Sequence, residues 1–420
     1  SNPTFVVNGA DVRDSILEPG CRVDSYGIVE DALMCCQSHV ELNGKLLRSI
    51  LGPLSGVAEG EISSSFVGPL VGFHHQAGLI GCYWPSGKGN IGFGANVGSN
   101  HTGKSPDQEL WAGEGVFFGL GCCIKYPCNL TQAPYTIVAT GVTTLPQKVE
   151  FPFSLISSPQ QPSSSSLSPA VNSIMPGWVL YRSLFTVFRN QYKFRKRSKV
   201  LGNDVVLEDR IFRYSIMDLV SVARKRLMDA QSTMFDTDGN LIYTEKHIPG
   251  LGKNFLTENS RKSAIEAYGL FLEYYALMGL LQKLKADNGR SITSIEKEIR
   301  EAVPITGEED FAFTGLSTSH GDQNSSKEWE HQKYILRGII DSTTDKEPIV
   351  PKLLSSLVSI ATTIIDMVKS SKSRDDVRGR KIIPMYEHAH IPAGDTKVVR
   401  LVTEEMELLQ KEAQKFLVSD

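Results

Sequence analysis

The feature that most constrains the fold is a six-residue repeat, clearest between Asn90 and Val142. Ile91-Gly92 and Val97-Gly98 stand six residues apart, and the beat returns at Phe118-Gly119, Ile124, Leu130 and the run 137–142. A period of six, with an aliphatic residue on the beat and a small residue after it, is typical of a parallel β-helix. Each aliphatic side chain fills the inside of a flat coil, and glycine adopts the backbone angles of the corners at little cost.

The six-residue repeat is already present near the start of the chain. Spacings of six, with one slip to five at Leu17, connect Val6, Val12, Leu17, Val23, Val29 and Cys35. We therefore expect the repeat array to begin before Ser1. The rhythm is irregular between Val40 and Glu61, which predicts loops or irregular coils there. Prolines and glycines predict two further excursions from the coil, at 83–89 and 104–113.

A change of composition divides the chain. Residues 157–172 are rich in serine, proline and glutamine and predict a flexible linker, because such a tract has little apolar surface to bury. We expect a β-helix domain at 1–156 and an α-helical domain at 173–420. Apolar residues three and four apart predict helices in the second region, around 216–227, 265–279, 353–367 and 402–416.

Two resemblances rest on these residues. The hexads resemble the left-handed β-helix superfamily of trimeric acyltransferases, typified by UDP-N-acetylglucosamine acyltransferase, over about the first third of the chain. The runs 115–121 and 132–146, with 176–180 and 250–254, resemble an uncharacterised bacterial family that joins such a β-helix to a helical C-terminal region. The fold class implied is a left-handed parallel β-helix followed by a mainly α-helical domain. The second family implies no activity.

The acyltransferase resemblance implies a catalytic histidine on the coil. In those enzymes a histidine at a subunit interface removes a proton from the acceptor, which then attacks the thioester of an acyl carrier. His101, between Asn100 and Thr102 beside the excursion, matches that role, and the pKa of a free imidazole lies near neutrality. The alternative is a ring that only stacks on the coil or hydrogen-bonds a loop.

His74 and His75 form a competing site. Neighbouring strand residues point to opposite faces, so at least one of these rings should face solvent or an interface. Their alternative role is a structural pair between subunits. We assign candidate substrate contacts to five residues. The amide of Asn100 would bind the substrate, Lys88 and Lys104 would face its phosphates, and Trp84 and Trp111 would form the lip of a pocket. Plain surface lysines, and tryptophans that merely cover the coil, are the alternatives.

Composition excludes several classes of function. A net charge of −3 does not favour nucleic-acid binding. The seven cysteines all precede residue 129 and include adjacent pairs, which predicts reduced thiols and a cytoplasmic location. Neither these cysteines nor His388 and His390 have metal-site spacing, and we predict no metal. The apolar segments 267–281 and 353–368 are too short or too polar to predict a membrane span.

A basic run near residue 190 leaves two interpretations open. Tyrosine and phenylalanine alternate there with Arg189, Lys193, Arg195, Lys196, Arg197 and Lys199. A solvated helix end is the simpler interpretation, and a phosphate or nucleotide contact is the other.

Three functions remain compatible with the sequence. The first is a homotrimeric hexapeptide-repeat transferase that moves an acyl group to a sugar nucleotide or similar acceptor, with acyl-CoA as the candidate co-substrate and no firm cofactor. The second is a non-catalytic trimeric assembly module. The third is the β-helix portion of a sugar-phosphate nucleotidyltransferase.

Overall fold

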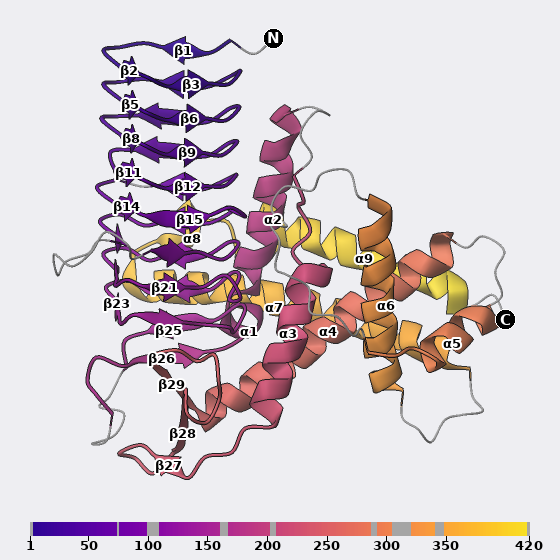
Figure 1. The fold of residues 1–420 in the computed structure, drawn as a ribbon. Coiled ribbons are helices and arrows are strands. Elements are labelled where there is room, and N and C mark those ends of the chain that lie inside the picture. The colour runs from indigo at the N-terminus through magenta and orange to yellow at the C-terminus, as the bar shows by residue number, and fades with distance from the viewer. Residues whose placement is uncertain are drawn as a thin grey trace.

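The computed structural model describes residues 3–73, 75–98, 109–159, 167–201, 207–286, 292–304, 321–340 and 348–417. The N-terminal part is a parallel β-helix with three short strands in each turn, followed by a mainly helical region (Figure 1). This confirms the fold class expected from the hexads. Each strand pairs in parallel with the strand one turn later, as Phe5 pairs with Arg22 and Val6 with Val23.

The strands form three sheets along the three sides of the coil, here called A, B and C. The coil part of sheet A contains β1 (Phe5–Val6), β4 (Arg22–Val23), β7 (His39–Glu41), β10 (Gly56–Ala58), β13 (Gly72–Phe73), β16 (Asn90–Ile91), β19 (Phe117–Phe118), β22 (Ile137–Val138) and β25 (Leu155–Ser157). Sheet B contains β2 (Asp11–Arg13), β5 (Ile28–Glu30), β8 (Lys45–Leu47), β11 (Glu61–Ser63), β14 (Gly78–Ile80), β17 (Asn96–Val97), β20 (Cys123–Ile124) and β23 (Thr143–Thr144). Sheet C contains β3 (Ile16–Leu17), β6 (Leu33–Met34), β9 (Ile50–Leu51), β12 (Phe66–Val67), β15 (Cys82–Trp84), β18 (Leu110–Trp111), β21 (Cys128–Asn129) and β24 (Gln147–Lys148).

The repeat is shorter than three hexads. His39 pairs with Arg22 and with Gly56, so these turns contain 17 residues. The missing residue lies at the corner between sheets B and C, where the step from one inward side chain to the next is five, as from Val29 to Met34. The slip to five at Leu17 therefore recurs in the following turns. Met34, fully buried, occupies the inward position that the hexads had assigned to Cys35.

The stretch between Val40 and Glu61 is regular, which corrects the expectation of loops or irregular coils. It forms β8, β9 and β10, and its inward residues Leu46, Leu51 and Val57 have no exposed surface. A strict six-residue template loses register with a 17-residue turn, and this made the segment look irregular.

Serine side chains stabilise the short corner between sheets B and C. The Oγ atoms of Ser15, Ser49 and Ser65 accept hydrogen bonds from backbone N–H groups of the next turn, at 3.1, 3.0 and 3.1 Å respectively. These bonds satisfy N–H groups that the corner turns away from the strand ladder.

Sheet A continues beyond the coil into the C-terminal region. β25 pairs with the antiparallel β26 (Asn172–Met175), and the sheet extends through β29 (Asn254–Thr257), β28 (Leu241–Thr244) and β27 (Met234–Phe235) to thirteen strands. The Ser/Pro-rich tract joins β25 to β26, and its residues 160–166 lie outside the described residues.

The C-terminal region is built mainly of helices. They are α1 (Trp178–Arg182), α2 (Leu184–Ser198), η1 (Lys199–Leu201), α3 (Tyr214–Met228), α4 (Glu258–Ala286), α5 (Ile292–Arg300), α6 (Gly321–Ile339), α7 (Ile349–Ile382), α8 (Tyr386–Ala389), η2 (Ala393–Asp395) and α9 (Lys397–Leu417). Helices α3, α4, α7 and α9 coincide with the four predicted apolar stripes. Their buried residues and the interior of the coil belong to one continuous hydrophobic core.

Two helices are longer than the apolar segments identified in the sequence. By length and composition alone, α4 and α7 could each cross a bilayer. Their most apolar windows are 67% and 44% buried within the protein. Much of this apolar surface is therefore already used for packing against other parts of the chain.

Helix α2 runs beside the coil at the corner between sheets C and A (Figure 1). Phe194 of α2 packs with Leu207 against the corner residues Leu54 and Leu70. Arg197 donates a hydrogen bond to the backbone carbonyl of Leu54. Part of the basic run is thus used to attach α2 to the coil, and is not a solvated helix end.

Adjacent residues of one coil strand provide a test of this architecture. Leu79 of β14 is fully buried, whereas the next residue, Ile80, is 40% exposed. We predict that Leu79→Ala lowers the free energy of unfolding by about 2–5 kcal/mol, the usual effect of truncating a core leucine. Ile80→Ala is the matched control and should lower it by less than about 1 kcal/mol. Urea unfolding followed by circular dichroism measures both, and equal losses would contradict the assigned register.

Candidate functional site

The longest interruption of the coil lies between β17 in sheet B and β18 in sheet C. Asn90 pairs with Phe117, so this turn contains 27 residues, whereas the turn from Gly72 to Asn90 contains 18. Residues 99–108 of the insertion, which include His101, Asn100 and Lys104, lie outside the described residues. The chain leaves the coil after Gly98 and re-enters it at Glu109.

Gly98 is required at the point where the insertion begins. Its φ of +82° lies in the left-handed region, and a Cβ atom there would come within 2.0 Å of the Tyr126 hydroxyl. Tyr126 is buried directly against this corner. Any other residue at 98 would displace Tyr126 or redirect the insertion.

Aromatic side chains on the outer face of sheet C flank the other end of the insertion. Trp111 is 41% exposed, and its Nε1 donates a hydrogen bond to Glu109 Oε2 at 2.6 Å. The Trp111 and Tyr83 rings have centroids 4.6 Å apart, and Tyr83 stacks on Phe66 at 5.7 Å. The predicted residue Trp111 thus belongs to an aromatic row beside the insertion.

The competing histidine site lies at a different corner. His75 follows β13, at the corner between sheets A and B, and its Nδ1 is 2.6 Å from Glu59 Oε2 of the previous turn. His74 lies outside the described residues. The insertion leaves the coil at the corner between sheets B and C, so His75 and the ends of the insertion are not at the same corner.

Trp84 and Lys88 lie inside the molecule, which corrects the expectation that they face a substrate. The Trp84 indole points into the coil, has no exposed surface, and donates a hydrogen bond to the Gly113 carbonyl at 2.8 Å. The step of five from Leu79 places Trp84 at an inward position. Lys88 is buried, and the carboxylate of Glu114, 3.1 Å from its ammonium group, compensates its charge there.

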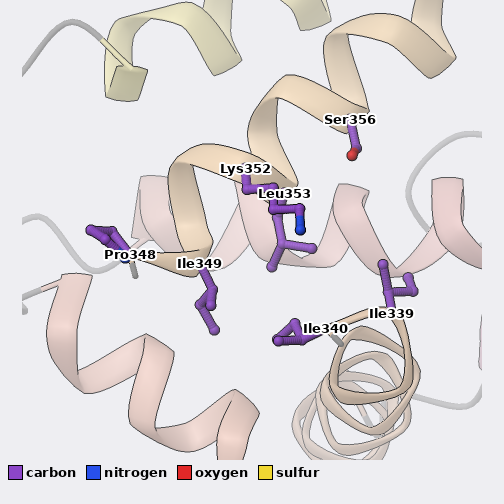
Figure 2. Close-up of a pocket in the computed structure, with 7 residues that line it drawn as sticks. All are labelled: Ile339, Ile340, Pro348, Ile349, Lys352, Leu353 and Ser356. Atoms are coloured by element: carbon purple, nitrogen blue, oxygen red, sulfur yellow. The ribbon is translucent and has the colours of Figure 1, made fainter. Parts of the chain in front are cut away.

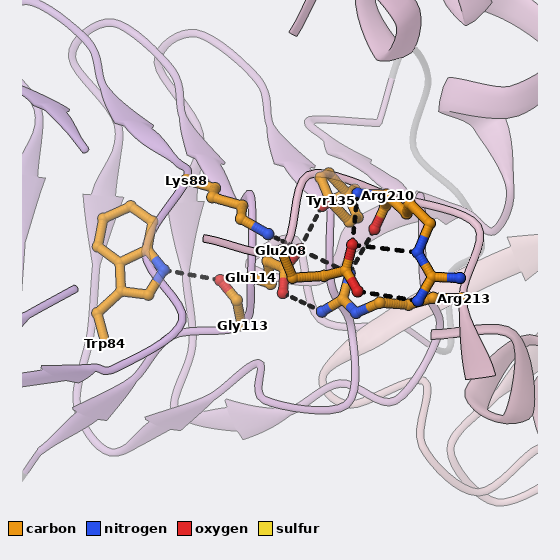
Figure 3. A network of polar contacts seen from close by, with 8 residues as sticks. All are labelled: Trp84, Lys88, Gly113, Glu114, Tyr135, Glu208, Arg210 and Arg213. Atoms are coloured by element: carbon orange, nitrogen blue, oxygen red, sulfur yellow. Dashed lines mark hydrogen bonds and ion pairs between the residues drawn. The ribbon is translucent and has the colours of Figure 1, made fainter. Parts of the chain in front are cut away.

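Glu114 is the centre of a buried polar network between the coil and the helical region (Figure 3). Lys88, Glu114 and Tyr135 come from successive turns at the corner between sheets C and A. Glu114 Oε1 accepts hydrogen bonds from Lys88 Nζ and from an Arg213 guanidinium nitrogen, both at 3.1 Å, and from the Tyr135 hydroxyl. A second Arg213 nitrogen contacts Oε2, so arginine binds the carboxylate through two bonds.

The network continues outward from Arg213, the residue that precedes α3. Arg213 also donates to the carbonyl of Arg210 at 2.8 Å. The Arg210 guanidinium pairs with Glu208 at 3.0 Å and with Glu328 of α6 at 3.1 Å. One carboxylate of the coil is thereby connected to two elements of the helical region.

The charges around Glu114 control its protonation. Burial by itself raises the pKa of this carboxyl group, but the nearby Arg213 and Lys88 charges outweigh burial and lower the pKa to about 2. Burial and the negative charge of Glu114 hold the pKa of Tyr135 well above its usual value. The site therefore contains a carboxylate that is ionised at neutral pH, and its geometry suits a structural joint.

This joint was not predicted from the sequence. Glu114 stands between two glycines in a run that the sequence assigned partly to an excursion, and Arg213 is 99 residues away along the chain. A charged residue in an otherwise apolar, Gly-rich corner was the only available signal. The sequence could not identify Arg213 as the partner of Glu114, because no local pattern links residues so far apart along the chain.

No metal centre is formed by the described part of the chain, where no three His, Cys, Asp or Glu side chains gather to hold an ion. His390 instead stacks on Tyr386, with ring centroids 4.0 Å apart. All seven cysteines are free thiols, and burial raises the pKa of Cys82 and Cys128, so neither is an activated nucleophile.

A small apolar pocket lies where α6 ends and α7 begins (Figure 2). Its volume is about 30 Å³, enough for one or two water molecules, whereas small-molecule sites usually measure hundreds of Å³. The pocket is lined by Ile339, Ile340, Pro348, Ile349, Lys352, Leu353 and Ser356. Its size excludes it as the binding site of a nucleotide or acyl carrier.

Replacing the central carboxylate tests the joint. Glu114→Gln leaves two buried cations without a counter-charge, and we expect the free energy of unfolding to fall by about 3–5 kcal/mol. Glu30→Gln is the matched control: Glu30 pairs with Arg13 at the surface, where such a pair contributes about 0–1 kcal/mol. Equal stability of the two variants in chemical denaturation would show that the network does not stabilise the fold.

The lowered pKa of Glu114 predicts a dependence of stability on pH. The folded-state pKa of about 2 lies below the ordinary 4.5, so the stabilisation is complete above pH 4.5 and is lost as pH falls toward 2. A difference of this size corresponds to a free energy on the order of 3 kcal/mol. The parent and Glu114→Gln should therefore converge in stability between pH 4.5 and 2. A constant difference across that range, measured by urea unfolding, would contradict the assignment.

Comparisons with known proteins add a distant relative. No protein-family model matches the chain. An uncharacterized protein of Treponema pallidum (strain Nichols) is 24% identical over 246 residues, which are 59% of this chain. The matched region is 33% of that relative's length, so the chain spans about a third of it. The likeness carries no assigned activity.

Proposed function

We propose that the chain is a hexapeptide-repeat transferase-like protein that moves an acyl group from an acyl-CoA or acyl carrier to a sugar-nucleotide or similar acceptor. The observation that carries the proposal is the insertion between β17 and β18, since it is the longest departure from an otherwise regular coil. Loops placed on a rigid scaffold are the usual positions of reacting groups. The parallel β-helix itself is consistent with such transferases.

The surroundings of the insertion fit an acceptor that has a flat ring. Its C-terminal end meets the row formed by Trp111 and Tyr83, whose rings offer a face for stacking a base or sugar. Glu109, held by the Trp111 indole, adds a carboxylate at the same edge. In this proposal Asn100 and Lys104 bind the acceptor and its phosphates.

His101 is the general base of the proposed reaction. Its neutral imidazole takes the proton from the acceptor hydroxyl or amine as that group attacks the thioester carbonyl. The thiolate of the carrier leaves, and the acyl group is then bonded to the acceptor. Histidine is suited to this role because its unperturbed pKa, about 6.5, lies near neutral pH.

The test is acetyl-CoA consumption by the parent over a panel of amino sugars and sugar nucleotides. His101→Ala should lower turnover by roughly 10²- to 10⁴-fold, the usual contribution of a positioned base. His247→Gln, a change of a histidine that hydrogen-bonds Thr244 in the helical region, should leave turnover unchanged. A loss on His75→Ala but not on His101→Ala would move the base to the other corner. Unchanged turnover in both variants would remove histidine from the mechanism.

A second candidate function is a non-catalytic assembly module. The observation that favours it is the joint between coil and helices, in which one sheet, one core and one buried ion network continue across both regions. A rigid joint of this kind suits a protein that holds helical arms on a β-helix. Absence of turnover by the parent on every acceptor would favour this function. In either case we propose a homotrimer as the working state.

A further inference from the structure

A shallow groove of about 760 Å³ runs over the outer face of sheet C near the N-terminal end of the coil. Ile16, Leu33 and Ile50, the outward residues of β3, β6 and β9, form its apolar floor. Ile16 is 69% exposed. Asp14 and Asp31, stacked at the neighbouring corner, form one edge of the groove.

The groove is acidic as well as apolar. Neither Asp14 nor Asp31 forms an ion pair within the described residues, and both are exposed. Arg48 continues the same edge and directs its guanidinium to the Ser63 hydroxyl at 3.2 Å. Residues 3–63 carry nine acidic and four basic side chains, so this end of the coil has an excess of negative charge.

A second apolar surface, with basic instead of acidic side chains around it, lies at the far end of α7. The buried face of this helix ends at Val368, and no residue from 369 to 392 is buried. We call residues 377–391 the tip. Its large apolar side chains are 51–69% exposed: Val377, Ile382, Ile383, Met385 and Ile391.

The tip is basic and has a defined shape. Arg378, Arg380 and Lys381 are exposed and form no ion pair within the part of the chain that the structure describes; Glu387 is the acidic residue among them. The Tyr386 ring packs against Gly379 and stacks on His390. The tip is therefore a folded turn that presents aliphatic and cationic side chains together.

We infer that the tip of one copy of this chain docks into the sheet C groove of a second copy. The aliphatic side chains of the tip cover the apolar floor, and its cations face Asp14 and Asp31. Within a single chain the apolar side chains of the tip and Ile16 are exposed, and Leu33 and Ile50 are half-buried, so neither surface covers the other there. Contact between two different surfaces is heterologous, and such contacts close into a ring when the rotation between copies allows it. The inference rests on the homotrimer in the proposed function and names its interface.

Charge favours a second copy over a lipid surface as the partner. An anionic bilayer would attract the tip but would leave the acidic groove uncovered. Docking between copies pairs the two charges and buries both apolar surfaces. Since the contact is partly electrostatic, it should weaken as ionic strength rises.

The test uses two variants of the 420-residue chain. The groove variant carries Ile16→Ser and Ile50→Ser, and the tip variant carries Ile382→Ser and Ile383→Ser. Ile16, Ile382 and Ile383 are exposed and Ile50 is half-buried on the outer face of β9, so none belongs to the core and folding, checked by circular dichroism, should be retained. By analytical ultracentrifugation at micromolar concentration, we expect a trimeric parent and two monomeric variants.

Mixing the two variants gives the decisive result. The groove variant still has a tip and the tip variant still has a groove, so an equimolar mixture should form a species of two chains and stop there. Val222→Ser with Val303→Ser, exposed positions elsewhere, should keep the mass of the parent. Two monomeric variants that stay monomeric on mixing would overturn the heterologous contact.

Other outcomes distinguish this inference from the proposal on which it rests. If both variants remain trimeric, the homotrimer stands but its interface lies elsewhere, and the inference fails. If the parent is a monomer, the homotrimer and the inference fail together. Co-sedimentation of a monomeric parent with phosphatidylglycerol vesicles, lost in the tip variant, would identify the tip as a membrane contact instead.

Discussion

The structure depends on the hydrogen-bonded pairing of each turn of the coil with the next. Strands of two or three residues cannot be stable alone, and here each strand within the coil pairs in parallel with those of the turns before and after it, except at the two ends of the coil. This pairing aligns the inward side chains, such as Val23, Val40 and Val57, into a continuous buried column.

The corner between sheets C and A is where the coil joins the rest of the molecule. At this corner, Leu54 and Leu70 of the earlier turns pack against α2. Glu114 of a later turn, with its neighbours Lys88 and Tyr135, binds Arg213. A row of aromatic rings extends the joint, since Tyr135 stacks on Phe153 and Phe153 on Phe212. Apolar packing holds one end of the joint and buried charge the other, so sliding of the helices along the coil would break both.

This arrangement separates the structural corner from the corner that carries the insertion. The buried ion network occupies one corner, and the insertion with its flanking aromatic row leaves the coil at another. A rigid joint on one side of a coil allows an opposite loop to vary without loss of the fold. The two ends of the insertion lie at the B–C corner, and the groove proposed to bind a second copy lies on the outer face of sheet C, away from the joint.

The sequence alone determined the β-helix and the helical region after it, because these follow from local periodicity and composition. Of the two expected excursions, 104–113 overlaps the insertion, whereas 83–89 is wrong, since it contains the end of β15 and an ordinary corner of the coil. The spacing of aliphatic residues predicted the inward positions until the five-residue step shifted the register at Met34 and Trp84. Only the tertiary structure decided which charged residues are buried. Lys88 looks like a surface lysine in the sequence, but it is buried against Glu114 of the next turn, and Glu114 in turn binds Arg213 of the helical region. Periodicity reports the direction of a side chain relative to its own strand or helix, whereas the partner of a charge is set by how those elements pack.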